Sequence, residues 1–247
     1  MQSEKRISTL GILGGLGPMA TVYFYELITA HTLATCDQDH IDIVISSKAT
    51  TPDRTAFVLG KSEENPLDVM KAEARKLVEF GAELISVPCN TAHYFYDELS
   101  ESVPVPVVNI IFETVSYVKS AGAGKIGVLA TEGTVKSGAY AHMCEKLGVG
   151  YEVPSEEDQA ALSEIIYSQI KQGKPADLDE FKRIAKTLTD KGCDKLILGC
   201  TELSVIAKGN KLDDVFVDSL DVLALRTIRL CGKTPIGFSD EMMRNII

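Results

Sequence analysis

Short apolar runs alternate with longer amphipathic segments along most of the chain. Apolar runs bounded by glycine, proline or polar residues are typical of buried strands, whereas apolar residues on one helical face predict helices. The expected strands cover residues 7–13, 42–46, 84–87, 103–110, 125–130, 151–153, 195–198 and 215–217. The expected helices cover residues 18–33, 66–80, 92–99, 111–121, 134–147, 156–171, 177–191 and 219–231. This alternation predicts an α/β fold of mostly parallel sheets flanked by helices, and only residues 234–247 stay unassigned.

A sequence repeat relates the two halves of the chain. At a constant spacing of 111 positions, residues of the first half coincide with identical residues of the second. The pairs are Lys71 and Lys182, Ala74 and Ala185, Leu77 and Leu188, Gly81 and Gly192, and Cys89 and Cys200. Convergence of helix–glycine–strand units is the alternative explanation. A genuine repeat predicts two pseudo-symmetric lobes that face each other across a cleft.

The proline-rich segment 103–110 is the natural crossover between the halves. We therefore place an N-terminal lobe at residues 1–110 and a second lobe at 111–217. The last apolar helix is expected to fold back, so that 218–247 completes the first lobe. Ligands of parallel α/β sheets bind beyond the carboxyl ends of the strands, which predicts an active site in the cleft between the lobes.

Composition and charge narrow the class of partner. Hydrophobic residues make up 45% and charged residues 24% of the 247 residues, as in ordinary globular proteins. The formal net charge is −10, so electrostatics gives no support for nucleic acid or an anionic membrane as a partner. Local basic side chains can still bind a small acidic metabolite.

Targeting features and cysteine usage lead us to expect a cytoplasmic protein. Glycines break the apolar run behind the basic N-terminus, which argues against a signal peptide. No window approaches the roughly 18 apolar residues of a membrane-spanning helix. The six cysteines are then expected to be reduced, and the absence of Cys-x-x-Cys spacing disfavours a zinc knuckle or thioredoxin-type motif.

A glycine turn, residues 14–17, follows the first expected strand. Its spacing is not Gly-x-Gly-x-x-Gly, which disfavours a dinucleotide as its ligand. Backbone N–H groups at a helix start bind anions, so an anion suits this turn better. A lone arginine, Arg54, lies in the next polar loop, where a surface pair with Asp53 is the alternative to anion binding.

Two thiols end equivalent expected strands of the two halves. Cys89 follows the strand at 84–87, and Cys200 follows the strand at 195–198. Each precedes small polar residues and an expected helix start, a position that lowers the pKa of a thiol. A thiolate on one face of a carbon acid can remove a proton while a thiol on the other face delivers one, which gives the mirror image. The reverse reaction exchanges the two roles.

No pyridoxal phosphate lysine motif, metal cluster or nucleotide motif accompanies these thiols. We therefore expect no cofactor and no metal, and a carbanion that hydrogen bonds and dipoles stabilise. Packing is the alternative for Cys89 and Cys200, and a redox dithiol is another. The remaining cysteines are interpreted as packing residues: Cys36, Cys144, Cys193 and Cys231.

These motifs together resemble the aspartate/glutamate racemase superfamily, specifically its aspartate racemase branch. They span nearly the whole chain and comprise residues 14–21 (GGLGPMAT), 52–54 (PDR), 89–93 (CNTAH), 130–134 (ATEGT) and 199–202 (GCTE). The resemblance implies two α/β lobes related by pseudo-twofold symmetry and an active site in the cleft. It also implies cofactor-independent racemisation by two cysteines, and a homodimer.

The resemblance further implies roles for single residues. Cys89 and Cys200 stand where the family has its two acid/base cysteines. Arg54 and Lys171 resemble the basic pair that aspartate racemases use on the substrate's carboxylates, and a guanidinium suits a carboxylate bidentately. The other expected substrate contacts are Asn90, Thr91, Thr131, Thr134, Thr201, Glu202, Gly15 and Met19.

The substrate is predicted to be aspartate, interconverted between its L and D forms. Dedicated glutamate racemases typically have Asp-Ser-Gly where this chain has Gly14-Gly15-Leu16, and His where Glu202 stands. A glutamate or broad-specificity racemase of the same family is the nearest alternative. A two-lobed protein that binds a dicarboxylate without chemistry is the alternative from another class.

Overall fold

Two separate four-stranded sheets form the frame of the molecule in a computed structural model that describes residues 7–210 and 212–246. The first sheet has the order β2-β1-β3-β4 and consists of β1 (Thr9–Gly14), β2 (Asp42–Ser47), β3 (Leu84–Ser86) and β4 (Val107–Val108). The second has the order β6-β5-β7-β8 and consists of β5 (Lys125–Leu129), β6 (Gly150–Glu152), β7 (Lys195–Leu198) and β8 (Phe216–Asp218). All paired strands are parallel. The predicted fold class is confirmed.

The two sheets share one strand order, in which the first strand of each half lies between the second and the third. Matching residues also make matching contacts. A carboxylate oxygen of Glu83, before β3, accepts the Ser8 N–H at 2.7 Å, and one of Asp194, before β7, accepts the Gly124 N–H at 2.8 Å. Glu83 and Asp194 are 111 positions apart. The sequence repeat therefore corresponds to a repeat of structure.

Helices connect consecutive strands. The first half contains α1 (Pro18–Ala30), α2 (Arg54–Val58), α3 (Leu67–Glu79), the 3₁₀ helix η2 (Thr91–Phe95), α4 (Tyr96–Ser100) and α5 (Ile110–Ser120). The rest of the chain contains α6 (Glu132–Lys136), α7 (Ala139–Leu147), α8 (Glu156–Glu164), α9 (Leu178–Asp190), α10 (Ser204–Gly209), α11 (Ser219–Leu230) and α12 (Asp240–Asn245). None of the described helices has the length and apolar character needed to cross a membrane.

Within the described part of the chain, three groups of buried side chains stabilise this arrangement. Leu77 on α3 belongs to a group under the first sheet, and Leu188 on α9 belongs to the matching group under the second. The largest group joins the halves, because it contains Ile12 of β1, Val128 of β5 and Leu223 of α11. Each such fully buried aliphatic side chain contributes about 1.5–3 kcal/mol of transfer free energy.

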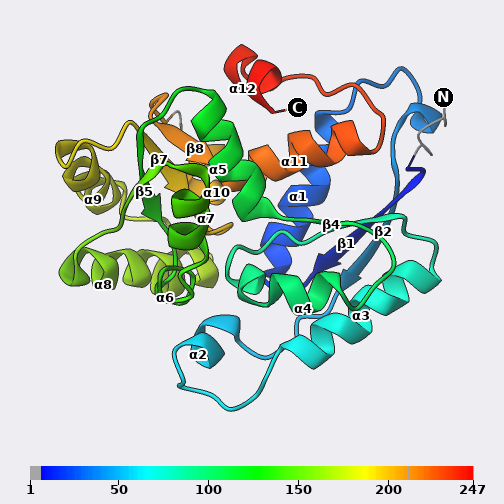
Figure 1. The fold of residues 1–247 in the computed structure, drawn as a ribbon, viewed down its shortest axis with the longest axis horizontal. Helices are drawn as coiled ribbons and strands as arrows, with labels where there is room; N and C mark the ends of the chain where they lie inside the picture. Colours follow the sequence, from blue (N-terminus) through cyan, green and yellow to red (C-terminus); the bar gives the residue numbers. More distant parts are fainter. Residues whose placement is uncertain (1–6, 211, 247) are drawn as a thin grey trace.

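Helix α11 packs against both α1 and α5, between the two sheets (Figure 1). It therefore lies beside the first half of the chain although it comes after the second sheet in sequence. The lobe boundaries at 110 and 217 stay a prediction. The N-terminal segment used in the targeting argument lies mostly outside the described residues, since the description begins at Ile7.

Several predicted elements differ in the structure, and the helix expected at 92–99 is the 3₁₀ helix η2 followed by α4. The strand expected at 103–110 is reduced to Val107–Val108, because two prolines supply no N–H for a ladder. The helix expected at 134–147 is divided at Gly138, whose φ of 71° is left-handed. The helix expected at 156–171 is α8 followed by a π-helical turn, η3 (Ile165–Gln169), and a 3₁₀ turn, η4 (Ile170–Gln172). The unassigned C-terminal segment forms α12.

Candidate active site

Cys89 and Cys200 line the same small cavity between the two halves. Both are buried, with exposed fractions of 7% and 5%. The cavity has a volume of about 20 Å³, which is room for about one water molecule. Each sheet presents the carboxyl end of its third strand to this cavity. The structure thus brings the two thiols together, and their catalytic roles stay a prediction.

The thiol of Cys200 is hydrogen-bonded to Glu202. Its Sγ donates to Glu202 Oε2 at 2.9 Å, and the other oxygen of that carboxylate lies 3.4 Å from Lys171 Nζ. The ammonium of Lys171 also lies 4.9 Å from the centre of the Tyr167 ring, a cation–π geometry. One side of the cavity is therefore a chain of thiol, carboxylate and ammonium.

These surroundings raise the pKa of the Cys200 thiol well above its usual value, first through burial and then through the adjacent Glu202 carboxylate. The expectation that a helix start would lower the pKa of this thiol is wrong. A turn follows Cys200, and helix α10 begins only at Ser204. After Cys89, by comparison, the 3₁₀ helix η2 begins at Thr91, two residues on. At neutral pH Cys200 is a thiol.

Lys171 and Tyr167 also have shifted pKa values. Burial, the largest single effect, lowers the pKa of the Lys171 ammonium, but the negative charge of Glu202 and the other acidic groups around it together outweigh burial, so the net shift is upward. Burial raises the pKa of the Tyr167 hydroxyl to about 12. The cavity therefore carries a protonated lysine beside a neutral tyrosine at physiological pH.

Arg54 is buried and does not pair with Asp53. Its guanidinium donates to the carbonyl oxygens of Thr51, Pro52 and Leu16 at 3.3, 3.0 and 2.7 Å. Its Nε is buried without a hydrogen-bond partner. The surface-pair alternative from the sequence is wrong, because backbone carbonyls hold this cation against the cavity wall. A buried guanidinium with unused donor capacity is suited to an anionic ligand.

Three threonine hydroxyls form a closed triangle across the halves. Thr91 Oγ1 lies 3.1 Å from Thr131 Oγ1 and 2.8 Å from Thr134 Oγ1, and the last two are 3.0 Å apart. Thr91 and Thr131 line the cavity, whereas Thr134 lies outside the set of lining residues. Thr201, which follows Cys200, also lines it and is buried. Hydroxyls of this kind can donate to a carboxylate or accept from an ammonium.

Asn90 lines the cavity, but contacts between the halves occupy its side chain. Its Nδ2 donates to Ser219 Oγ at 3.0 Å, and its Oδ1 accepts from the Tyr140 hydroxyl at 2.8 Å. Ser219 Oγ in turn donates to the Leu198 carbonyl at 2.7 Å. The amide of Asn90 therefore joins the end of β3 to β7 and α11.

Gly15 and Met19 do not line this cavity in the structure. Gly15 has a φ of 79°, and a Cβ placed on it would lie 2.4 Å from the backbone nitrogen of Lys48. Gly15 therefore lies in a tight turn that packs against the loop after β2. Met19 lies on α1 with an exposed fraction of 71%.

The structure adds lining residues that were not among the predicted contacts: Leu16, Asp53, Thr55 and Tyr167. Asp53 and Leu16 belong to motifs already recognised in the sequence, at 52–54 and 14–21. Tyr167 lies four positions before Lys171, a helical spacing that places both on one face. Thr55 gave no signal of its own in the sequence.

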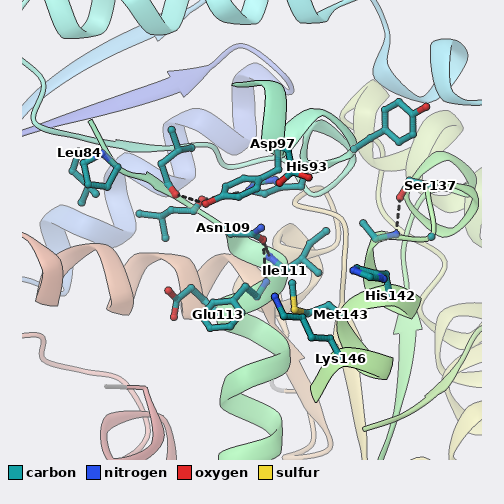
Figure 2. A pocket seen from close by; sticks show the side chains of 18 of the residues that line it. Leu84, His93, Asp97, Asn109, Ile111, Glu113, Ser137, His142, Met143 and Lys146 are labelled. Atoms are coloured by element: carbon teal, nitrogen blue, oxygen red, sulfur yellow. Dashed lines mark hydrogen bonds between the residues drawn. The ribbon is translucent and has the colours of Figure 1, made fainter. Parts of the chain in front are cut away.

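A larger groove of about 770 Å³ lies elsewhere, along β4, α5 and α7 (Figure 2). Two of its polar side chains bond to the backbone. His93 accepts from Ile110 N–H through Nε2 at 3.2 Å, and Asn109 caps α5. Burial lowers the pKa of His93, so its ring is neutral at pH 7. Neither cavity cysteine lines this groove, so its size does not make it the candidate active site.

Comparisons with known proteins match this chain to amino-acid racemases. A family model described as Asp/Glu/Hydantoin racemase matches residues 13–227. A broad specificity amino-acid racemase of Bacillus subtilis, RacX, is 30% identical over 231 residues, which cover 89% of this chain and 96% of that protein. A glutamate racemase of Persephonella marina is 33% identical over 150 residues, 59% of this chain and 56% of that protein. The solved structure of Picrophilus torridus aspartate racemase matches with a TM-score of 0.82 and 28% identity, over 97% of this chain and 100% of that one.

Proposed function

The chain belongs to the Asp/Glu/hydantoin racemase family, and from this premise we propose that it interconverts L- and D-aspartate without a cofactor. Cys89 and Cys200 act from opposite faces of Cα. One takes the Cα proton as a thiolate, and the other delivers its thiol proton to the opposite face. The two sulfurs exchange protonation states in each turnover, and the reverse reaction exchanges their roles.

One observation carries the proposal: two buried thiols, each at the end of an equivalent strand, line one cavity that also holds two cationic side chains. Packing alone does not explain why both sulfurs share a cavity with Arg54 and Lys171. A carbon acid held between the thiols would have both carboxylates within the field of these cations. That field offsets the negative charge that develops when Cα loses its proton.

Aspartate is favoured over a neutral amino acid because the cavity carries two cations. A buried guanidinium suits the α-carboxylate, and the ammonium of Lys171 suits a second carboxylate at a short distance. The buried hydroxyls of Thr91, Thr131 and Thr201 supply donors and acceptors for the remaining polar atoms. The similarity to the Picrophilus torridus aspartate racemase supports this choice.

Broad specificity is the second candidate, favoured by the 30% identity to the Bacillus subtilis enzyme over nearly its full length. The two candidates differ in the response to substrates that lack the distal carboxylate. An aspartate racemase loses most of its kcat/KM on alanine, whereas a broad-specificity enzyme does not.

We further propose that the protein acts in the cytoplasm and that it is a homodimer. Light scattering of the purified protein tests the homodimer.

Incubation in deuterated water tests the function. L-aspartate should be converted to D-aspartate that carries deuterium at Cα, because the delivered proton comes from a thiol that exchanges with solvent. Glutamate and alanine, assayed in parallel, report the specificity. If none of the three amino acids racemises or exchanges its Cα proton, the proposed function is wrong. Turnover that survives in Cys89→Ala or Cys200→Ala would exclude the two-thiol mechanism.

A further inference from the structure

Glu202 is the one acidic side chain that touches both the thiol and the lysine of the candidate active site among the residues described. One oxygen accepts the Cys200 thiol proton at 2.9 Å, and the other lies 3.4 Å from Lys171 Nζ. A Cβ placed on Gly17 would lie 2.8 Å from this second oxygen, Oε1, so a larger residue at 17 would displace the carboxylate. The side chain is 13% exposed. Glu202 therefore fills the space between thiol, lysine and turn.

This position conflicts with a substrate that carries two carboxylates. A distal carboxylate needs the Lys171 ammonium, which Glu202 already neutralises, and two carboxylates close together repel each other. The cavity, with a volume of about 20 Å³, has no room for an amino acid beside Glu202. Binding of a dicarboxylate thus requires that Glu202 moves away from Lys171.

We propose that Glu202 is an internal competitor for the substrate's carboxylate. In the substrate-free enzyme its carboxylate occupies Lys171 and keeps the proton on Cys200, and the substrate's distal carboxylate takes its place at Lys171. The inference rests on the proposed function, because it takes a dicarboxylate as the ligand. It assigns Glu202 a positioning role, different from the substrate contact expected from the sequence.

Two structural features support displacement. Lys171 is held by one carboxylate and one aromatic face, with 30% of its side chain exposed, so it can change partner without leaving the cavity. Arg54, by contrast, donates hydrogen bonds to three backbone carbonyls, which hold its guanidinium in place. The exchange therefore takes place at the lysine.

The charged and titratable groups that face Cys200 come from several elements. Glu202 follows β7 and Cys89 follows β3. Tyr167 lies in η3, Lys171 lies in η4, and Asp53 and Arg54 lie at the start of α2. These residues line one cavity. Of them, only Glu202 accepts a hydrogen bond from the Cys200 thiol among the bonds described. Removal of the Glu202 charge is expected to change the acidity of this thiol more than removal of the others.

Calorimetric binding of succinate, an unreactive dicarboxylate, tests the competition. Glu202→Gln should bind succinate about fivefold tighter than the parent, because a partly buried ion pair of about 1 kcal/mol no longer competes. Glu202→Asp, whose shorter carboxylate reaches Lys171 less well, should lie between the two. Glu152→Gln is the matched control, since it removes a carboxylate from an ion pair with Lys125 and Lys191 on another surface. It should bind succinate as the parent does.

The acidity of Cys200 gives a second readout that a purely structural role would not change. In a Cys89→Ala background the ultraviolet absorbance of the thiolate, followed against pH, reports the buried thiols. Glu202→Gln should move the Cys200 transition to lower pH, because the neutral amide no longer stabilises the protonated form. The double variant Cys89→Ala with Cys200→Ala lacks the Cys200 thiol. The transition that disappears in it belongs to Cys200.

The outcomes separate the inference from the function on which it rests. Tighter succinate binding in Glu202→Gln, with the Cys200 transition lowered, supports the inference. Equal or weaker binding in Glu202→Gln, in a parent that racemises aspartate, overturns the inference and leaves the function standing. A parent that neither racemises aspartate nor binds succinate overturns both.

Discussion

The residues behind the two strand-end cysteines occupy matching positions of the repeat but make different contacts. Asn90 and Thr91 follow Cys89, and their side chains bond to Ser219, Tyr140 and the threonine pair of the other half. Thr201 and Glu202 follow Cys200, and Glu202 bonds to the thiol beside it and faces Lys171. One strand end thus joins the halves, whereas the other holds charge.

This comparison shows that two sheets with the same strand order can carry different side-chain functions at equivalent positions. The strand order places both sulfurs, and nothing in that order distinguishes them. The difference comes from the second residue after each cysteine, a hydroxyl at Thr91 and a carboxylate at Glu202. Burial and this carboxylate together keep the proton on Cys200.

Serine substitutions test whether both sulfurs are equally necessary. Cys89→Ser and Cys200→Ser should each lower racemisation by about a thousandfold or more, because a hydroxyl is a far weaker acid and base than a thiol. Chiral chromatography of the products measures the rate. Cys193→Ser, a buried thiol outside the cavity, is the control for folding. If only one of the two cavity variants lost activity, the two sulfurs would not be equally necessary for racemisation.

Lys171→Met tests the charged side of the cavity. The KM for aspartate should rise by about 10- to 100-fold, as expected for a lost charge-assisted hydrogen bond of about 1.5–3 kcal/mol. Alanine turnover, where measurable, should change much less, since alanine lacks the distal carboxylate. Lys174→Met, an exposed lysine in the next turn, should leave both substrates unchanged. Equal losses for aspartate and alanine would contradict the role of Lys171.

The two enantiomers should differ in kcat. Burial and the Glu202 carboxylate raise the pKa of Cys200, so the form of the enzyme in which Cys200 is the thiolate is the rarer one. Each unit by which the pKa of Cys200 is raised changes the ratio of the two forms about tenfold. L- and D-aspartate have equal free energies, so kcat/KM must be equal for both, and KM must differ in proportion to kcat.

The same raised pKa fixes the sign of the pH dependence. A thiol with a raised pKa keeps its proton to higher pH. Cys200 therefore loses the proton that it must deliver to Cα, and the rate falls, only on the alkaline side. Glu202→Gln should move this alkaline limb to lower pH and reduce the difference in kcat between the enantiomers. Initial rates from each pure enantiomer across pH measure both effects. Identical kcat values in the parent would show that the two thiols are equivalent despite Glu202.

Tyr140→Phe tests the joining side of the comparison and should have the smallest effect. It removes the donor to Asn90 Oδ1, a buried hydrogen bond of 2.8 Å. The free energy of unfolding should fall by about 1 kcal/mol, which lowers Tm by about 2–4 °C in calorimetry. Tyr94→Phe, with the hydroxyl of an exposed tyrosine removed, is the control. A large loss of kcat in Tyr140→Phe would show that Asn90 does more than join the halves.

The fold could be predicted because its evidence is local. Each apolar run is followed by a polar residue or a glycine, and alternation with helices requires parallel strands. The positions of Cys89 and Cys200 relative to β3 and β7 follow directly from that pattern. The segment with Pro104 and Pro106 misled the prediction, because apolar residues without N–H donors match the strand pattern but cannot complete a ladder.

The charge chain at Cys200 could not be predicted, because it depends on geometry between distant segments. Lys171 reaches Glu202 from the 3₁₀ turn η4, which follows a π-helical turn that periodicity does not reveal. The sequence predicted a continuous helix there and a lowered pKa for both thiols. Burial of Arg54 was equally hidden, since its three carbonyl partners belong to two separate loops.

The shared strand order also bears on the ancestry of the chain. One half alone has a sheet, a strand-end thiol and an open edge, and two identical copies that faced each other would already place two thiols across a cleft. Such a pair of identical subunits would be bound to have the same residue behind both thiols. Fusion of the copies into one gene removes that constraint, so that Thr91 and Glu202 can diverge at matching positions. The linked halves thus allow mutation to change one side of a symmetric site while the other is kept.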